Sequence, residues 1–132
     1  MIIELTKSNI DIVKNSFIQE EKIVNEFNNN PFAKIFILIE DNTVIGYIYY
    51  SEIYERIEIN QFEIEKSHRN CGKGKKLLQY MLDKTKKDVT LEVRKDNLPA
   101  IKLYQNNGFQ EKATRKGYYN GIDGILMERR LK

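Results

Sequence analysis

The hydrophobic pattern in the first half of the chain is that of β-strands. Two runs rich in isoleucine, tyrosine and phenylalanine, "KIFILIE" and "TVIGYIYYSEIY", flank Asp41 and Asn42, a pair typical of tight hairpin turns. A shorter apolar run, "IIEL" at residues 2–5, predicts a further strand. The chain is therefore expected to begin with a strand and then to build an antiparallel hairpin.

The segment "RIEINQFEIE" contains the most informative irregularity of the pattern. Apolar residues occupy alternate positions up to Ile59 and again from Phe62, so the period of two slips by one residue at Asn60 and Gln61. Two short strands with an irregular join would give the same pattern. Because both halves keep a clean alternation, it favours one strand with a β-bulge, which bends the strand and leaves backbone groups unpaired.

Helical signals occur in the first half of the chain and directly after the bulged strand. "SNID" at residues 8–11 resembles a capping box for a helix that reaches Phe17, and a second short helix ends at Asn30 and Pro31. A third helix follows "HRNCGKGKK" and runs to about Lys87, with leucines and a methionine on one face.

The last third of the chain adds a strand, a helix and a hairpin. "VTLEVR" alternates, so that its valines and leucine lie on the face opposite Glu92. In "DNLPAIKLYQNNGF", Asn97 is the expected N-cap and Gly108 the residue just past the helix end. Two final strands are expected at about 109–117 and 123–131. The whole order predicts a mixed α+β fold in a single domain, residues 1–132.

Composition and charge exclude several kinds of protein. The net charge of +3 is mildly basic, which suits either nucleic acid or a polyanionic cofactor. Cys71 and His68 are the only residues of their types, so an internal disulfide and a cysteine-based zinc cluster are excluded, and a metal site is not expected. The sequence has no apolar run near 18 residues and no basic leader with an apolar core, so we expect a cytoplasmic protein without membrane association.

The segment "HRNCGKGKKLL", residues 68–78, has the composition of an anion-binding loop. It lacks the spacing of a Walker A loop, and Leu77 stands where a dinucleotide fingerprint needs its third glycine. What remains is an arginine and two glycines, Gly72 and Gly74, between a strand and a helix. Missing side chains let backbone N–H groups approach an anion at the helix N-terminus, and this geometry suits a pyrophosphate.

The arrangement R-x-x-G-x-G after a bulged strand, followed by "N…A…LY…GF", resembles the GNAT superfamily of acetyl-CoA-dependent N-acetyltransferases. The segment "LEVRKDNLPAIKLYQNNGF" is similar to the RimI-type group, which acetylates N-terminal amines of ribosomal proteins. The resemblance implies a GNAT fold: a central, mostly antiparallel twisted sheet of about six to seven strands, about four helices, and strands that splay at the bulge.

The resemblance also implies where acetyl-CoA, the acetyl donor, would bind. Backbone groups of the loop would hold the pyrophosphate, the bulged half of the strand would pair with the pantetheine arm, and a later asparagine and tyrosine would complete the site. The implied cofactor-binding residues are Phe62, Glu63, Ile64, Arg69, Asn70, Cys71, Gly72, Lys73, Gly74, Lys75, Asn97 and Tyr104.

Three catalytic residues are implied. Tyr104 matches the tyrosine that protonates the departing CoA thiolate, and Glu92 matches the glutamate proposed as a general base. Glu92 could equally be a surface residue or a partner of Arg94, and Glu63 on the bulged strand is the rival base. Tyr118 and Tyr119 are expected either to line the acceptor groove or to be exposed hairpin residues.

The acceptor stays open between a peptide N-terminus and a small amine such as a polyamine, an amino acid or an aminoglycoside. A non-catalytic CoA-binding module is a further alternative, although Glu92 and Tyr104 are both present. Nucleic-acid binding would rest on lysines alone, without interleaved aromatic residues, and is not expected. Relatives of this kind are often monomers or dimers, so we expect a monomer or homodimer.

Overall fold

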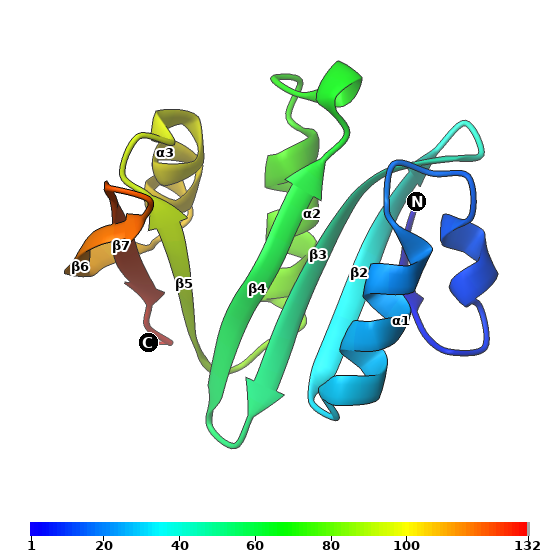
Figure 1. Cartoon of the computed structure of the whole chain (residues 1–132), viewed down its shortest axis with the longest axis horizontal. Helices are drawn as coiled ribbons and strands as arrows, with labels where there is room; N and C mark the ends of the chain where they lie inside the picture. Colours follow the sequence, from blue (N-terminus) through cyan, green and yellow to red (C-terminus); the bar gives the residue numbers. More distant parts are fainter. Residues whose placement is uncertain (132) are drawn as a thin grey trace.

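The computed structural model describes residues 1–131, which form seven strands, three α-helices and two 3₁₀ helices (Figure 1). In chain order they are β1 (Ile2–Leu5), η1 (Ile10–Val13), α1 (Glu20–Asn29), β2 (Ala33–Glu40), β3 (Thr43–Ile53), β4 (Arg56–Ile64), η2 (Lys66–His68), α2 (Lys73–Asp83), β5 (Asp88–Arg94), α3 (Leu98–Asn106), β6 (Gln110–Tyr119) and β7 (Ile122–Arg129). The predicted turn between β2 and β3 is confirmed, and Asp41 and Asn42 both have positive φ there.

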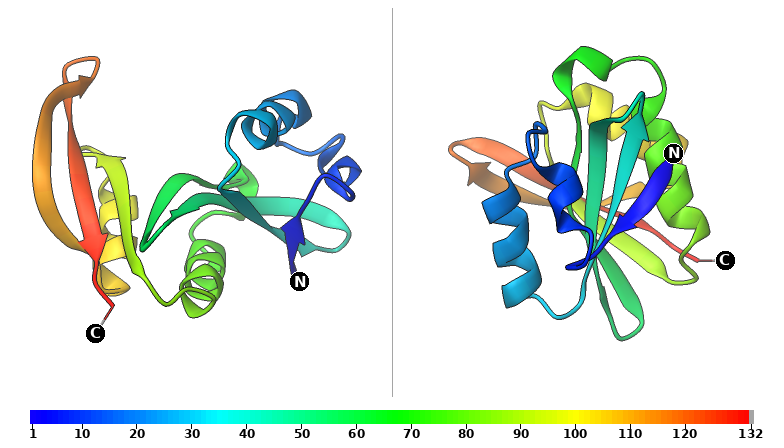
Figure 2. Two further views of the ribbon diagram at one scale, coloured as in Figure 1. Left: turned by 90° about the horizontal axis from the view of Figure 1, so that it is seen from below. Right: turned by 90° about the vertical axis from the view of Figure 1, so that its right-hand side faces the viewer.

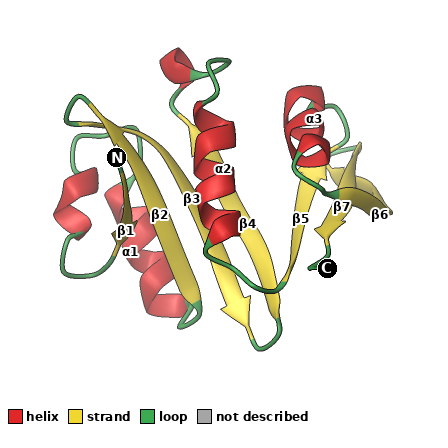
Figure 3. Ribbon diagram, turned by 180° about the vertical axis from the view of Figure 1, so that it is seen from behind, coloured by secondary structure: helices red, strands yellow, loops and turns green. Residues whose placement is uncertain are grey.

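The strands form one sheet in the order β1-β2-β3-β4-β5-β7-β6. Among the described strands, β4 and β5 are the one parallel pair, and every other neighbouring pair is antiparallel. Helix α1 lies on one face of the sheet, and α2 and α3 lie on the other (Figures 2 and 3). The predicted mixed and mostly antiparallel fold is confirmed.

The predicted bulge is present in β4. Tyr50 pairs with Ile59 and Tyr49 pairs with Gln61, which leaves Asn60 as the extra residue of the strand. Because the bulge absorbs one residue, the apolar residues of β4 before and after it lie on the same face of the sheet.

The parallel pairing of β4 with β5 ends at the same place. Residues Arg56–Ile59 pair with Asp88–Leu91, and the ladder stops there. Beyond this point β4 continues along β3, while β5 continues along β7. The two central strands therefore separate towards their carboxyl ends (Figure 1), and each presents an unpaired backbone edge to the other.

Two apolar layers hold the helices on the sheet. One lies between β1–β3 and the helical segments η1 and α1 and contains Val13 and Ile23. The other lies between the sheet, α2 and α3 and contains Ile57, Leu78 and Met81. Burial of one such side chain contributes about 1.5–3 kcal/mol. Because the first layer ends at β3, no described helix covers that face of β5, β7 and β6 (Figure 2).

Two predicted helix boundaries are wrong. The helix expected to reach Phe17 is a single 3₁₀ turn, because the Asn9 side chain accepts a hydrogen bond from the backbone N–H of Thr6 instead of capping a helix. Helix α2 ends at Asp83 rather than near Lys87. In the described part of the chain, no helix is long and apolar enough to cross a membrane.

Candidate active site

A cleft of about 730 Å³ opens where β4 and β5 separate. Its walls come from the end of β4, the loop before α2, the end of β5, the helix α3 and the tip of the β6–β7 hairpin. The lining residues are Ile59, Asn60, Gln61, Phe62, Glu63, Ile64, Arg69, Asn70, Gly72, Gly74, Lys75, Leu91, Glu92, Val93, Arg94, Asn97, Pro99, Ala100, Leu103, Tyr104 and Tyr119. Most of the residues predicted from separate sequence segments thus meet in one cavity.

The glycine loop places the N-terminus of α2 at one end of this cleft. Gly72 is the N-cap and has φ of 81°, and the first backbone hydrogen bond of the helix runs from the N–H of Lys76 to its carbonyl. The N–H groups of the preceding residues therefore lack helical partners and can bind an anion. Gly74 lies close to Phe62 and Ile64, so the helix begins directly against the cleft wall.

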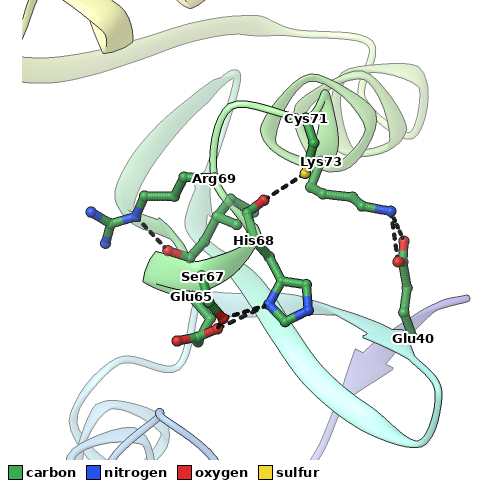
Figure 4. A network of polar contacts seen from close by, with 8 residues as sticks. Glu40, Glu65, Ser67, His68, Arg69, Cys71 and Lys73 are labelled. Atoms are coloured by element: carbon green, nitrogen blue, oxygen red, sulfur yellow. Dashed lines mark hydrogen bonds and ion pairs between the residues drawn. The ribbon is translucent and has the colours of Figure 1, made fainter.

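Side chains of the loop are largely held by the protein itself (Figure 4). The Nε of Arg69 donates to the Ile64 carbonyl at 2.8 Å, and the thiol of Cys71 donates to the His68 carbonyl at 2.9 Å. The amino group of Lys73 is turned away from the cleft. Cys71 and Lys73 are absent from the cleft lining, so any contact with an anion there would come from their backbone N–H groups.

Tyr104 occupies the apolar inner wall of the cleft. Its side chain is 7% exposed and lies between the rings of Phe62 and Phe109, whose centroids are 6.3 and 5.6 Å away. Burial raises the pKa of Tyr104 to about 12, so the phenol stays protonated at neutral pH and can donate a proton. Asn97 is the predicted N-cap of α3, and its Oδ1 accepts from the Ala100 N–H at 3.3 Å.

Glu92 lies on the face of β5 that is not covered by a described helix. Its Oε1 is buried and has no hydrogen-bond partner among residues 1–131, and its nearest cation is the Nε of Arg115 at 3.5 Å. The alternative partner considered from the sequence, Arg94, instead forms two hydrogen bonds with Asp96. Glu92 is thus a desolvated acceptor at the cleft rather than a free surface residue.

The tip of the β6–β7 hairpin closes over Glu92. Burial is the main cause of the raised pKa of Tyr119, and the negative charge of Glu92 adds to it. The ring of Tyr118 packs edge-on against Tyr119, with centroids 4.9 Å apart, and Arg115 stacks over Tyr118 at 4.7 Å. Tyr119 lines the cleft, whereas Tyr118 is 54% exposed and is not among the lining residues.

Glu63, the rival base, has a more open position. Its side chain is 48% exposed, and its Oε1 lies 3.9 Å from the guanidinium of Arg69. It lines the cleft from the end of β4, beside the loop rather than beside the hairpin.

Two important neighbours of Glu92 were missed by sequence reasoning. Arg115 is brought to it by the pairing of β6 with β7 and of β7 with β5. Gly124 lies so close that a Cβ there would be 2.9 Å from Oε1 of Glu92. The glycine in the terminal "NGIDG" segment was the available signal, but without the strand register it could be assigned only to a turn.

The cleft therefore combines the N-terminus of a helix, a buried tyrosine and a partly buried carboxylate. The profile of the acetyltransferase (GNAT) family matches residues 5–109. The chain belongs to this family, which confirms the family predicted from the loop and the later "LY…GF" segment.

The relatives agree with this assignment. The N-alpha-acetyltransferase of Saccharolobus solfataricus is 32% identical over 114 residues, which cover 73% of this chain and 68% of that protein. The crystal structure of the ribosomal-protein-S18-alanine N-acetyltransferase from Escherichia coli superposes with a TM-score of 0.84 at 21% identity and covers all of this chain and 94% of that one. A GNAT acetyltransferase from Elizabethkingia anophelis, solved with acetyl-CoA bound, has a TM-score of 0.79 at 20% identity and covers 99% and 97%.

Proposed function

We propose that this acetyltransferase moves the acetyl group of acetyl-CoA to the N-terminal amine of a protein or peptide. The observation that carries the proposal is the position of Glu92, a partly buried carboxylate with one buried oxygen, at a sheet face that no described helix covers. An extended chain end can approach such a face without a closed pocket. The 32% identity to an N-alpha-acetyltransferase supports the same acceptor class.

The residues present fit acetyl-CoA. The N–H groups after Gly72 would hold the pyrophosphate, with Arg69 and Lys75 close by on the cleft wall. The unpaired edge of β4 between Gln61 and Ile64 would pair with the amide groups of the pantetheine arm, as a strand does. Asn97 lies across the cleft, at the start of α3.

The chemistry needs two proton transfers and no covalent intermediate on the protein. Acetyl-CoA supplies an activated acyl group whose carbon–sulfur bond breaks as the nitrogen–carbon bond forms. We assign removal of the amine proton to Glu92, directly or through a water molecule, because an ammonium nitrogen has no lone pair with which to attack. We assign protonation of the departing sulfur to Tyr104, whose hydroxyl keeps its proton at neutral pH.

Glu92 is preferred to Glu63 as the base because of its surroundings. The half-exposed carboxylate of Glu63 is beside Arg69, near the end of the cleft assigned to phosphate. Glu92 is more enclosed, with 23% of its side chain exposed, and lies beside Tyr119 at the acceptor face.

Replacement of Glu92 by glutamine should slow turnover about tenfold at pH 7, because an N-terminal amine with a pKa near 7.7–8.0 is then roughly 10–15% neutral. Turnover should approach the wild-type rate near pH 9, where the amine loses its proton without help. The measurement is kcat against pH for a peptide acceptor. Equal rates at every pH would move the role to Glu63, for which Glu63→Gln is the matched variant.

The pH dependence of kcat in Glu92→Gln also distinguishes an N-terminal amine acceptor from an alkylamine acceptor. For a side-chain-like alkylamine with a pKa near 10.4, the deficit at pH 7 would be on the order of a thousandfold, with recovery only above pH 10. Thiol release from acetyl-CoA should be tested in parallel with free-N-terminus peptides, their N-terminally blocked forms and a panel of polyamines and aminoglycosides. Turnover with the small amines alone would overturn the peptide acceptor, and acetyl-CoA binding without any turnover would favour a non-catalytic module.

A further inference from the structure

Lys73 stands inside the glycine loop, but its side chain contacts a distant strand. Its Nζ lies 2.6 Å from both carboxylate oxygens of Glu40, which is 33 residues earlier in the chain. The two side chains are 26% and 27% exposed, so the ion pair is partly shielded from water. This pair, which we call the loop anchor, is visible at one side of Figure 4.

Glu40 is held by well-defined structure. It is the last residue of β2 and pairs with Thr43 across the hairpin, directly before the turn in which Asp41 and Asn42 have positive φ. Lys73 is the first residue of α2. The loop anchor therefore joins the tip of the β2–β3 hairpin to the first turn of the helix.

The polar side-chain contacts that the structure describes for residues 65–72 are more local. In the part of the chain that the structure describes, the polar side-chain contacts of residues 65–72 involve partners no more than six residues away, such as His68 with Glu65 and Arg69 with Ile64. These local contacts shape the loop and tie it to the end of β4. The loop anchor is the polar side-chain contact that joins it to a distant strand, β2.

The side chain of Lys73 is also not positioned to contact a phosphate group bound in the cleft. Its charge is compensated by a bidentate carboxylate, and its side chain does not line the cleft, whereas Lys75 does. The same pair stabilises the ionised form of Glu40, because the hydrogen bond from Lys73 is the chief cause of the lowered pKa of Glu40.

We propose that Glu40 is a positioning residue for acetyl-CoA binding, which acts through Lys73. It fixes the first turn of α2 so that the N–H groups following Gly72 point into the cleft before the cofactor arrives. A loop that is ordered in advance loses less conformational entropy on binding, and affinity rises accordingly. This inference rests on the proposed role of the loop in holding acetyl-CoA.

The test is a double-mutant cycle on acetyl-CoA affinity, measured by calorimetry on the full chain. Glu40→Ala and Lys73→Met should each raise Kd about three- to tenfold, and the double variant should be no weaker than the weaker single variant, because both remove the same contact. The conservative Lys73→Arg keeps the pair and should bind nearly as the wild type does. In steady-state kinetics, the KM for acetyl-CoA of Glu40→Ala should rise by about the same factor as its Kd, and kcat should change less than KM.

Amide hydrogen exchange at Lys76, the first amide of α2 with a helical hydrogen-bond partner, gives a readout that general destabilisation would not reproduce. It should be faster in ligand-free Glu40→Ala than in the wild type, with exchange in β6 and β7 unchanged. Tighter acetyl-CoA binding by Glu40→Ala would show that Glu40 only keeps Lys73 away from the phosphates. Additive effects of the two substitutions on Kd would show that the residues act independently. Either result overturns the proposal. If wild-type protein binds no acetyl-CoA, the loop assignment itself fails, which is a distinct outcome.

Discussion

Replacement of Gly72 by glutamate should abolish measurable acetyl-CoA binding, with an increase in Kd of at least about a hundredfold. The residue has φ of 81°, a conformation that costs a non-glycine residue about 1 kcal/mol. The larger cost is electrostatic, because a carboxylate at the helix N-terminus would occupy the partial positive charge that the pyrophosphate needs and would repel it by about 1–4 kcal/mol per charge pair at contact. Calorimetric titration with acetyl-CoA measures the loss.

The structure supplies matched controls for this variant. A Cβ at position 72 would meet no protein atom within 4 Å, so the substitution is not expected to clash with the protein itself. Gly72→Asn introduces a neutral side chain that tolerates positive φ, as Asn70 in the same loop already does, and should keep most of the affinity. Glutamate at this position with unchanged affinity would refute the assignment of the loop to acetyl-CoA.

Replacement of Tyr104 by phenylalanine should lower kcat on the order of a hundredfold, which is the lower range for loss of a general acid. Phenylalanine keeps the ring between Phe62 and Phe109, so the fold and the affinity for acetyl-CoA should change little. Because burial raises the pKa of Tyr104 to about 12, the wild-type kcat should show no loss of the acid form up to about pH 10. Single-turnover kinetics at saturating acetyl-CoA separate this effect from binding.

The control for Tyr104→Phe is the same change at Tyr80, which lies on α2 against Phe36 and does not line the large cleft. That variant should retain full kcat. If Tyr104→Phe were equally active, the sulfur would have to leave as the thiolate or take its proton from water.

Features set by neighbouring residues could be predicted from the sequence. The slip in alternation located the bulge at Asn60 and Gln61, and the structure assigns Asn60 as its extra residue. The capping residue of α3 was recognised as Asn97. The same kind of reasoning failed at "SNID", where the Asn9 side chain accepts a hydrogen bond from the backbone N–H of Thr6 and caps no helix. Local signals decide local structure only where they do not compete with one another.

Contacts between distant elements could not be predicted. Arg115 reaches Glu92 through two strand registers, and β6 shifts its register between Arg115 and Tyr119. The loop anchor joins Glu40 and Lys73 across 33 positions of sequence, and nothing in the spacing of the lysines indicates which of them has a partner. Such contacts depend on how the sheet is assembled, and they decide which charged residues of the loop and the cleft remain available to ligands.

The short parallel ladder between β4 and β5 has a consequence for the amount of enzyme in the cell. Four residue pairs join the two central strands, so a donor bound between them would connect the halves of the sheet on both sides of the cleft. A ligand present at a hundred times its Kd stabilises the folded state by about 2.7 kcal/mol, a sizeable part of the 5–15 kcal/mol typical of a domain. Folded protein would then be protected from proteolysis when acetyl-CoA is abundant and degraded faster when it is scarce.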